Sequence, residues 1–218
     1  MTGTYNTGPR LRRGVARPVD EIVSREAVLR HWLHLESRKR DETLAVDAMD
    51  ERELLAALME RTSGENRLLW RTGATTWRRG PVTERRLRRL RTVAAPDGLG
   101  WHRVAPEESV FTAARRIRDA EVTDDTTPLV DVEAIRRIAR GLPEADLNDL
   151  VLVTGQTTTS PRVVDGNHRA VAVALHLLDG GEMPDLSAYV GVVEARPLAL
   201  LRTKLRWLAR GYLRGEWW

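Results

Sequence analysis

Apolar residues recur at helical spacing along much of the N-terminal part of the chain. Residues 22–39 carry them on one side, and Ser24 can cap a helix there. Asp50 and Glu53 come close to a capping box, and leucines at helical spacing follow them. We therefore predict helices over 22–39, 50–62 and 83–93, with loops and one short strand over 67–82.

The second half mixes short strand patterns with helices. Leu150–Val153 is a continuous apolar run that is typical of a buried strand. Arg162–Val164 follows a polar turn, so the two runs predict a hairpin. The remaining expectations are strands over 101–106 and 189–193, and helices over 108–119, 132–139, 170–178 and 198–213.

Together these patterns predict the α+β fold class, with a helical N-terminal part followed by a small mixed sheet with helices. The Pro- and Gly-containing stretch AAPDGLG at residues 94–100 marks a boundary between the two parts. We expect a disordered leader over 1–18, a helical region over 19–97 and an α+β domain with a C-terminal amphipathic helix over 98–218.

The composition excludes several kinds of site. The 218 residues include no cysteine, which excludes disulfides, thiolate metal sites and thiol nucleophiles. No window is apolar enough for a membrane span, and the N-terminus lacks the apolar core of a signal peptide, so we expect a cytoplasmic protein. The net charge is +4, and only Lys39 and Lys204 are lysines. Either a GC-rich genome or an affinity for phosphate explains the arginine excess.

A polar break separates an apolar strand pattern from an apolar helix pattern in V-V-D-G-N-H-R, residues 163–169. Gly166 allows a sharp turn, and a helix that begins near Asn167 would present unpaired N–H groups to an anion. Arg169 adds a fork of donors, and His168 can donate to the anion or move a proton. We expect a nucleotide or phosphate site that consists of Asp165, Gly166, Asn167, His168 and Arg169.

A plain structural interpretation of the same residues stays open. Asp165 can cap the helix, Gly166 can simply make the turn, and His168 and Arg169 can lie in solvent. We favour a site because the polar residues occur together between two apolar elements.

The strand, the D-G-N-H-R loop and the alanine-rich helix resemble the signature loop of the ParB-like and sulfiredoxin-like superfamily. Members carry D-G-H-H-R, G-E-R-R or G-C-H-R at this place. The approach is similar too, with Ala105-Pro106-Glu107-Glu108, then AIRRIARGLP, then LVLV. The resemblance covers residues 101–195 and implies a small domain that binds a nucleotide at this loop.

The superfamily includes several chemistries, and the residues exclude some. Sulfiredoxins use a cysteine where this chain has Asn167. Partitioning ParB proteins continue into a helix-turn-helix reader, for which the residues after Ala195 are too few. The closest branch carries D-G-H-H-R and includes kinases that phosphorylate free serine. Fic-type transferases share D-G-N-x-R but need a histidine before it, where this chain has Ser160-Pro161-Arg162.

The resemblance and the residues together predict an enzyme that is a small-molecule phosphotransferase or an NTPase. Its nucleotide would be ATP, ADP or CTP with Mg²⁺. Glu107 or Glu108 would act as general base or metal ligand, His168 would be catalytic, and Asp165 would hold the metal. A structural explanation of Glu107 and Glu108 is equally good, because the helix dipole favours acidic residues in the first turn of a helix.

Two alternatives use other residues. A nucleic-acid-binding or CTP-regulated DNA-associated module would use the arginine-rich helix over 83–92, through Arg85, Arg86, Arg88 and Arg89. A protein-interaction module, or a homodimer, would use the last helix and Trp217-Trp218. His31, His34 and His176 lack the further ligands that a metal site needs.

Overall fold

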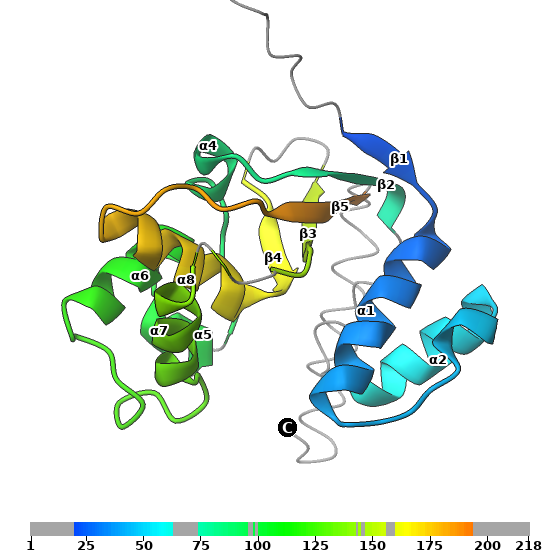
Figure 1. Cartoon of the computed structure of the whole chain (residues 1–218), viewed down its shortest axis with the longest axis horizontal. Coiled ribbons are helices and arrows are strands. Elements are labelled where there is room, and N and C mark those ends of the chain that lie inside the picture. Colours follow the sequence, from blue (N-terminus) through cyan, green and yellow to red (C-terminus); the bar gives the residue numbers. More distant parts are fainter. Residues whose placement is uncertain are drawn as a thin grey trace, which may run out of the picture.

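The sheet and the helices lie in three layers. The computed structural model describes residues 20–62, 74–95, 98, 100–142, 144, 147–155 and 160–193. Within these residues a five-stranded mixed sheet lies between two groups of helices, so the predicted α+β class is confirmed (Figure 1). The predicted leader, the predicted helix over 198–213 and Trp217-Trp218 lie outside the described residues.

One sheet joins strands from both predicted parts of the chain. Its order is β1, β2, β5, β3, β4. β2 pairs antiparallel with β1 and β5, while β3 runs parallel to β5 and forms the predicted hairpin with β4. The bounds are β1 Glu21–Val23, β2 Ala74–Pro81, β3 Leu150–Gly155, β4 Arg162–Asp165 and β5 Ser187–Val193.

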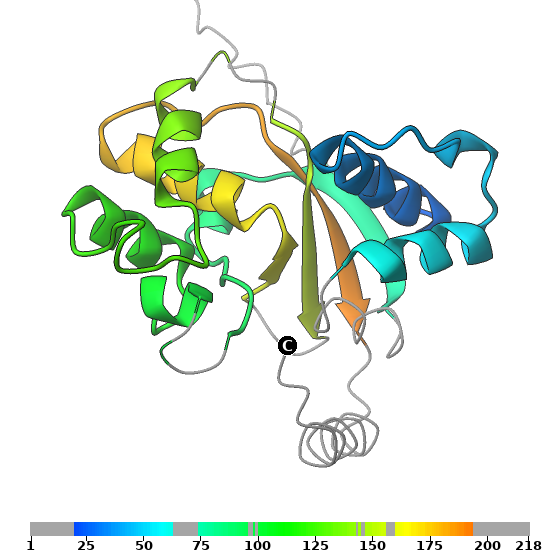
Figure 2. The same cartoon turned by 90° about the horizontal axis from the view of Figure 1, so that it is seen from below.

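Helices cover both faces of this sheet. α1 (Arg25–Lys39) and α2 (Glu51–Arg61) lie on one face, and α6 (Val110–Arg118), α7 (Val132–Arg140) and α8 (Asn167–Leu178) lie on the other (Figure 2). The described residues also form short helical segments at η1 (Val46–Ala48), α4 (Glu84–Leu87) and α5 (Gly100–Val104). Among the helices described, none has the length and apolarity that crossing a membrane requires.

The alternation along β3 explains the three layers. Leu150 and Leu152 are fully buried in the core shared with α6, α7 and α8, whereas Val151 is buried in the core shared with α1 and α2. Successive side chains of a strand point to opposite faces, so a run of apolar residues predicts a strand covered on both sides. The caps of α1 and α2 are also as expected, because Ser24 and Asp50 accept hydrogen bonds from Ala27 and Glu53.

The α1 layer packs on the sheet around Trp77 of β2. Its indole is 2% exposed and lies over Gly191 of the neighbouring strand β5. A Cβ at position 191 would lie 2.8 Å from Cη2 of the indole. Gly191 therefore provides the space that lets this ring fill the core between α1 and the sheet.

The predicted helix over 83–93 is wrong in its length. α4 ends at Leu87, and the chain then extends, so that Arg91 bridges to Arg162 of β4. The Arg91 N–H donates to Pro161, and the Val163 N–H donates to Arg91. Leu87 and Leu90 are both buried, so one turn followed by extended chain satisfies the same apolar spacing as a helix.

The predicted strand over 101–106 is also wrong. Residues 100–104 form the helix α5, which buries Trp101 and Val104 on one side. These two residues are three positions apart, a spacing that suits a helical turn. So short an apolar pattern does not distinguish the two structures.

Candidate functional site

The polar loop forms the predicted turn between β4 and α8. Gly166 has φ 91°, in the left-handed region, and α8 begins at Asn167. A Cβ at position 166 would lie 2.5 Å from Cδ2 of Leu150, so the turn needs glycine for its conformation and for its space. Within the described part of the chain no side-chain hydrogen bond caps this helix, and the Ala170 N–H donates to the Gly166 carbonyl. The N–H groups before Ala170 are the ones that a helix cannot satisfy itself.

The three side chains that follow Gly166 reach three different parts of the molecule. The Asn167 amide oxygen accepts a hydrogen bond of 2.9 Å from the Val93 N–H. His168 packs against Trp101 of α5. Arg169 turns back to the residues that precede β3. The loop is therefore a junction between segments, and its side chains do not converge on one point.

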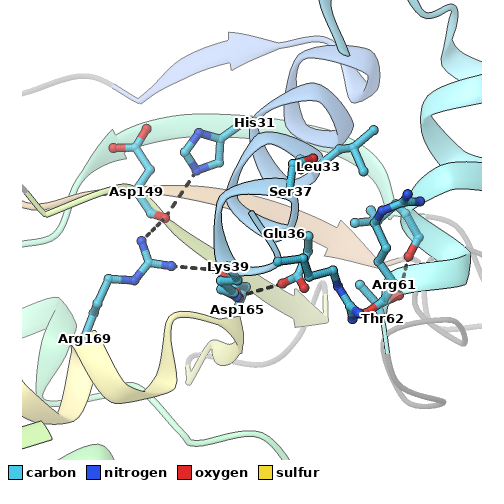
Figure 3. A network of polar contacts seen from close by, with 12 residues as sticks. His31, Leu33, Glu36, Ser37, Lys39, Arg61, Thr62, Asp149, Asp165 and Arg169 are labelled. Carbon is cyan, nitrogen blue, oxygen red and sulfur yellow. Dashed lines mark hydrogen bonds and ion pairs between the residues drawn. The ribbon is translucent and has the colours of Figure 1, made fainter. Parts of the chain in front are cut away.

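Arg169 is held by protein acceptors. Its Nη1 donates to the carbonyls of Asn148 and Asp149 at 2.7 and 3.2 Å, and its Nη2 donates to Oδ2 of Asp165 at 2.6 Å (Figure 3). The Arg169 and Asp165 side chains are only 15% and 10% exposed. Arg169 thus fixes the start of β3 to the end of β4, which a solvated arginine would not do.

A lysine from α1 completes the environment of Asp165. Lys39 Nζ lies 3.0 Å from Oδ1 of Asp165 and 2.7 Å from Oε1 of Glu36 (Figure 3). Partial burial opposes the charge of Lys39, but the carboxylates of Asp165 and Glu36 outweigh it and raise the pKa of Lys39. Both oxygens of the buried Asp165 are therefore bound by cations from different elements.

Sequence reasoning missed Lys39 as a site residue. A signal was present, because the chain has 35 basic residues and only two of them are lysines. Lysine presents a compact charge with three donors, while arginine presents a planar fork. One of only two lysines was therefore a candidate for a specific contact.

His31 lies at the other side of the same network. Its Nε2 is 3.4 Å from the Asp149 carbonyl, and its ring packs against Tyr189 with centroids 4.9 Å apart. Burial lowers the pKa of His31. The Asp149 carboxylate in turn accepts from Arg79 at 2.6 and 3.3 Å. α1, β2 and the segment before β3 are thereby joined beside the loop, and Figure 3 shows His31 and Asp149 of this network.

His168 differs from its neighbours because its Nε2 has no polar partner among the described residues. Its Nε2 is buried and makes no hydrogen bond within the described residues. The ring lies edge-on to Trp101, with centroids 5.1 Å apart and an interplanar angle of 74°. Burial lowers the pKa of His168, which favours the neutral imidazole.

The structure does not bring the predicted acids to the loop. Glu108 binds Arg91 and Arg162, the latter at 2.8 Å, and Arg162 stands at the opposite end of β4 from Asp165. Hydrogen bonding to Arg162 lowers the pKa of Glu108, which weakens it as a base. Glu107 is exposed. A catalytic role for either acid stays a prediction that this geometry does not favour.

The described residues do not fit a magnesium site at the loop. Lys39 and Arg169 already occupy both oxygens of Asp165. Among the residues described, no group of three His, Cys, Asp or Glu could hold a metal ion. His34, for which the sequence offers no further metal ligands, pairs with Asp47 at 3.1 Å. The chain's own side chains therefore supply no ligand set for Mg²⁺ in this part of the molecule.

Two of the four arginines proposed to bind nucleic acid form ion pairs with acidic residues of the chain. Arg86 pairs with Asp20 at 3.3 Å, and Arg88 pairs with Glu84 at 2.6 Å and stacks over Phe111. Arg85 and Arg89 are exposed and, with Arg86, line a cavity of about 220 Å³. The predicted continuous basic helix is thus replaced by one helical turn and a bend.

Comparison with models of protein families, with curated proteins and with solved structures finds no match to this chain. The function of the site therefore has to be inferred from its own residues.

Replacing Arg169 should destabilise the fold far more than replacing Lys39. Arg169→Met leaves the buried Asp165 carboxylate undercompensated and two carbonyls without their donor, so we expect a loss of about 3 kcal/mol in the free energy of unfolding. The Lys39 side chain is 53% exposed, so Lys39→Met should cost less than about 1 kcal/mol. Urea unfolding at pH 7 measures both.

Adding Asp165→Asn to Arg169→Met should recover part of the loss, because the uncompensated charge disappears. The exposed Arg115→Met on α6 serves as control and should have little effect. Equal costs for Arg169→Met and Lys39→Met would contradict the assigned role of Arg169.

Glu108 should make the stability depend on pH. The pKa of Glu108 is lowered from its ordinary value of 4.5, so its stabilising contribution is present above that value and is lost as the pH falls through the folded-state pKa. The difference in unfolding free energy between the wild type and Glu108→Gln should therefore shrink in acid. Glu107→Gln, the exposed neighbour, should track the wild type at every pH. A difference that stays constant from neutral to acidic pH would refute the ion-pair role.

Proposed function

We propose that this chain binds the phosphates of a nucleotide at the N-terminus of α8, as the resemblance to ParB-like domains implies. The observation that carries the proposal is the uncapped start of a 12-residue helix after the left-handed Gly166. Unpaired N–H groups and the positive end of the helix dipole favour an anion at such a position. The turn itself has no room for a larger residue than glycine.

Two side chains beside the turn support the proposal. Lys39 keeps 53% of its side chain exposed while one oxygen of Asp165 orients it. A lysine in this setting can donate to a phosphate oxygen without leaving Asp165, because the ammonium has three donors. Arg169 serves as a positioning residue, since its guanidinium is bound to protein carbonyls and to Asp165.

We further propose phosphoryl transfer as the reaction, to the hydroxyl of a small molecule or to water. The bond between the terminal phosphorus and the leaving oxygen breaks, the acceptor oxygen bonds to phosphorus, and the acceptor proton passes to a base. We assign that last role to His168 of the same loop, because burial favours its neutral imidazole and its buried Nε2 has no partner among the described residues. Positioning and charge neutralisation do most of the work in such a reaction.

A thermal-shift screen with ATP, ADP and CTP, each with and without Mg²⁺, tests the binding. A nucleotide at a hundred times its dissociation constant should stabilise the fold by about 2.7 kcal/mol. Lys39→Met should weaken binding roughly tenfold, the effect of one hydrogen bond to a charged group. Arg38→Met is the matched control, because Arg38 is the exposed neighbour of Lys39 on the same helix.

The variants separate binding from reaction. His168→Gln should bind the nucleotide as the wild type does and lose turnover. Equal affinities in the wild type and Lys39→Met would reject the site. A salt-sensitive gel shift with a single-stranded oligonucleotide, lost when Arg85 and Arg89 are replaced by Ala, would support the nucleic-acid alternative instead. The cavity lined by these two arginines is the observation that supports this alternative.

A further inference from the structure

A second cavity lies on the helical layer, at the far end of α8 from the loop. Its volume is about 310 Å³, which is at the lower end of the range for small-molecule sites. The residues that line it come from the C-terminal parts of α6, α7 and α8. Both α6 and α7 pack against α8 (Figure 1). Since α8 has 12 residues, the two helix ends are roughly 18 Å apart, so this cavity is separate from the loop.

The cavity has an apolar floor and a basic rim. Ile117, Ala139 and Leu175 line the floor and are all buried. The rim has Arg118, Arg136, Arg140 and His176, with Asp179 as its one acid. An apolar floor with a few polar groups above it is the usual form of a site for a small organic molecule.

Arg136 is the rim residue that is ready to bind an anion. Arg118 and Arg140 pair with Asp119 and Glu133, which offset their charges. Arg136 instead donates from Nη2 to the Ile117 carbonyl at 3.2 Å, and no ion pair to it is present among the described residues. This hydrogen bond fixes the guanidinium while the charge and the other N–H donors stay available.

His176 is a second residue of the rim whose ring is held in place. Its ring lies against Gly181, where a Cβ would be 2.1 Å from Nε2 of the imidazole. Helix dipoles explain basic residues in the last turn of a helix, such as Arg140 on α7. Arg136 stands before that turn of α7, and the carbonyl that it binds belongs to the last turn of α6, so one of its donors has a structural role while the guanidinium still borders the open space.

We propose that this cavity binds a small organic anion, with one phosphate or carboxylate on an apolar body. The anionic group pairs with Arg136 beside His176, and the apolar body lies on Ala139 and Leu175. The volume suits a body no larger than a ring with a few substituents. This site is independent of the proposed nucleotide site, because it uses none of its residues.

Titration with phenyl phosphate, benzoate and inorganic phosphate tests the proposal. The chain has five histidines, so each imidazole signal can be assigned in a carbon–proton NMR spectrum by substitution. Phenyl phosphate or benzoate should shift the His176 signal and should bind more tightly than inorganic phosphate, which lacks the apolar body. A preference between the first two probes identifies the anionic group.

Arg136→Gln should weaken binding of the preferred probe roughly tenfold or more, the effect of one charge-assisted hydrogen bond. Arg137→Gln is the matched control, since Arg137 is the exposed next residue of α7, and it should bind as the wild type does. Urea unfolding of both variants confirms that each is folded. The proposal is overturned if neither organic probe moves the His176 signal, or if Arg136→Gln and Arg137→Gln bind equally well.

Discussion

The buried carboxylate of Asp165 is the constraint on which the rest of the site depends. This side chain lies at the end of β4 and is 10% exposed, so its charge must be compensated locally. Arg169 supplies one cation from the first turn of α8, and Lys39 supplies the other from the last turn of α1. The two helices lie on opposite faces of the sheet, so this one carboxylate ties all three layers together (Figure 3).

Because of this arrangement, the groups at the loop have two different roles. Asn167 and Arg169 position the turn by binding Val93 and the carbonyls before β3. In the proposed site, the backbone N–H groups at the helix start and the partly exposed Lys39 ammonium would bind the phosphate. The arginine of such a motif can therefore be essential for the shape of a site without touching what the site binds.

Local features could be predicted from the sequence because local chemistry determines them. The apolar runs of β3 and β4, the caps at Ser24 and Asp50, and the turn at Gly166 all follow from residues close in the chain. The helix proposed for residues 83–93 failed because the same apolar spacing also suits one turn followed by extended chain. Backbone pairing with β4 favours the second, and that pairing is not visible in a local pattern.

Contacts between residues far apart in the sequence could not be predicted either, because they depend on how the helices pack on the sheet. Lys39 and Asp165 are 126 positions apart, and only the packing of α1 on the sheet brings them to 3.0 Å. Glu107 or Glu108 was expected to act at the loop because of the resemblance to ParB-like domains, but two arginine partners hold Glu108 at the other end of β4.

The central claim is that a phosphate binds the open start of α8. An ADP titration followed by backbone amide NMR tests it most directly. The account predicts that the amides of Asn167, His168 and Arg169 shift together and saturate with one dissociation constant. Shifts that leave these three amides unchanged while ADP binds elsewhere on the chain would contradict it.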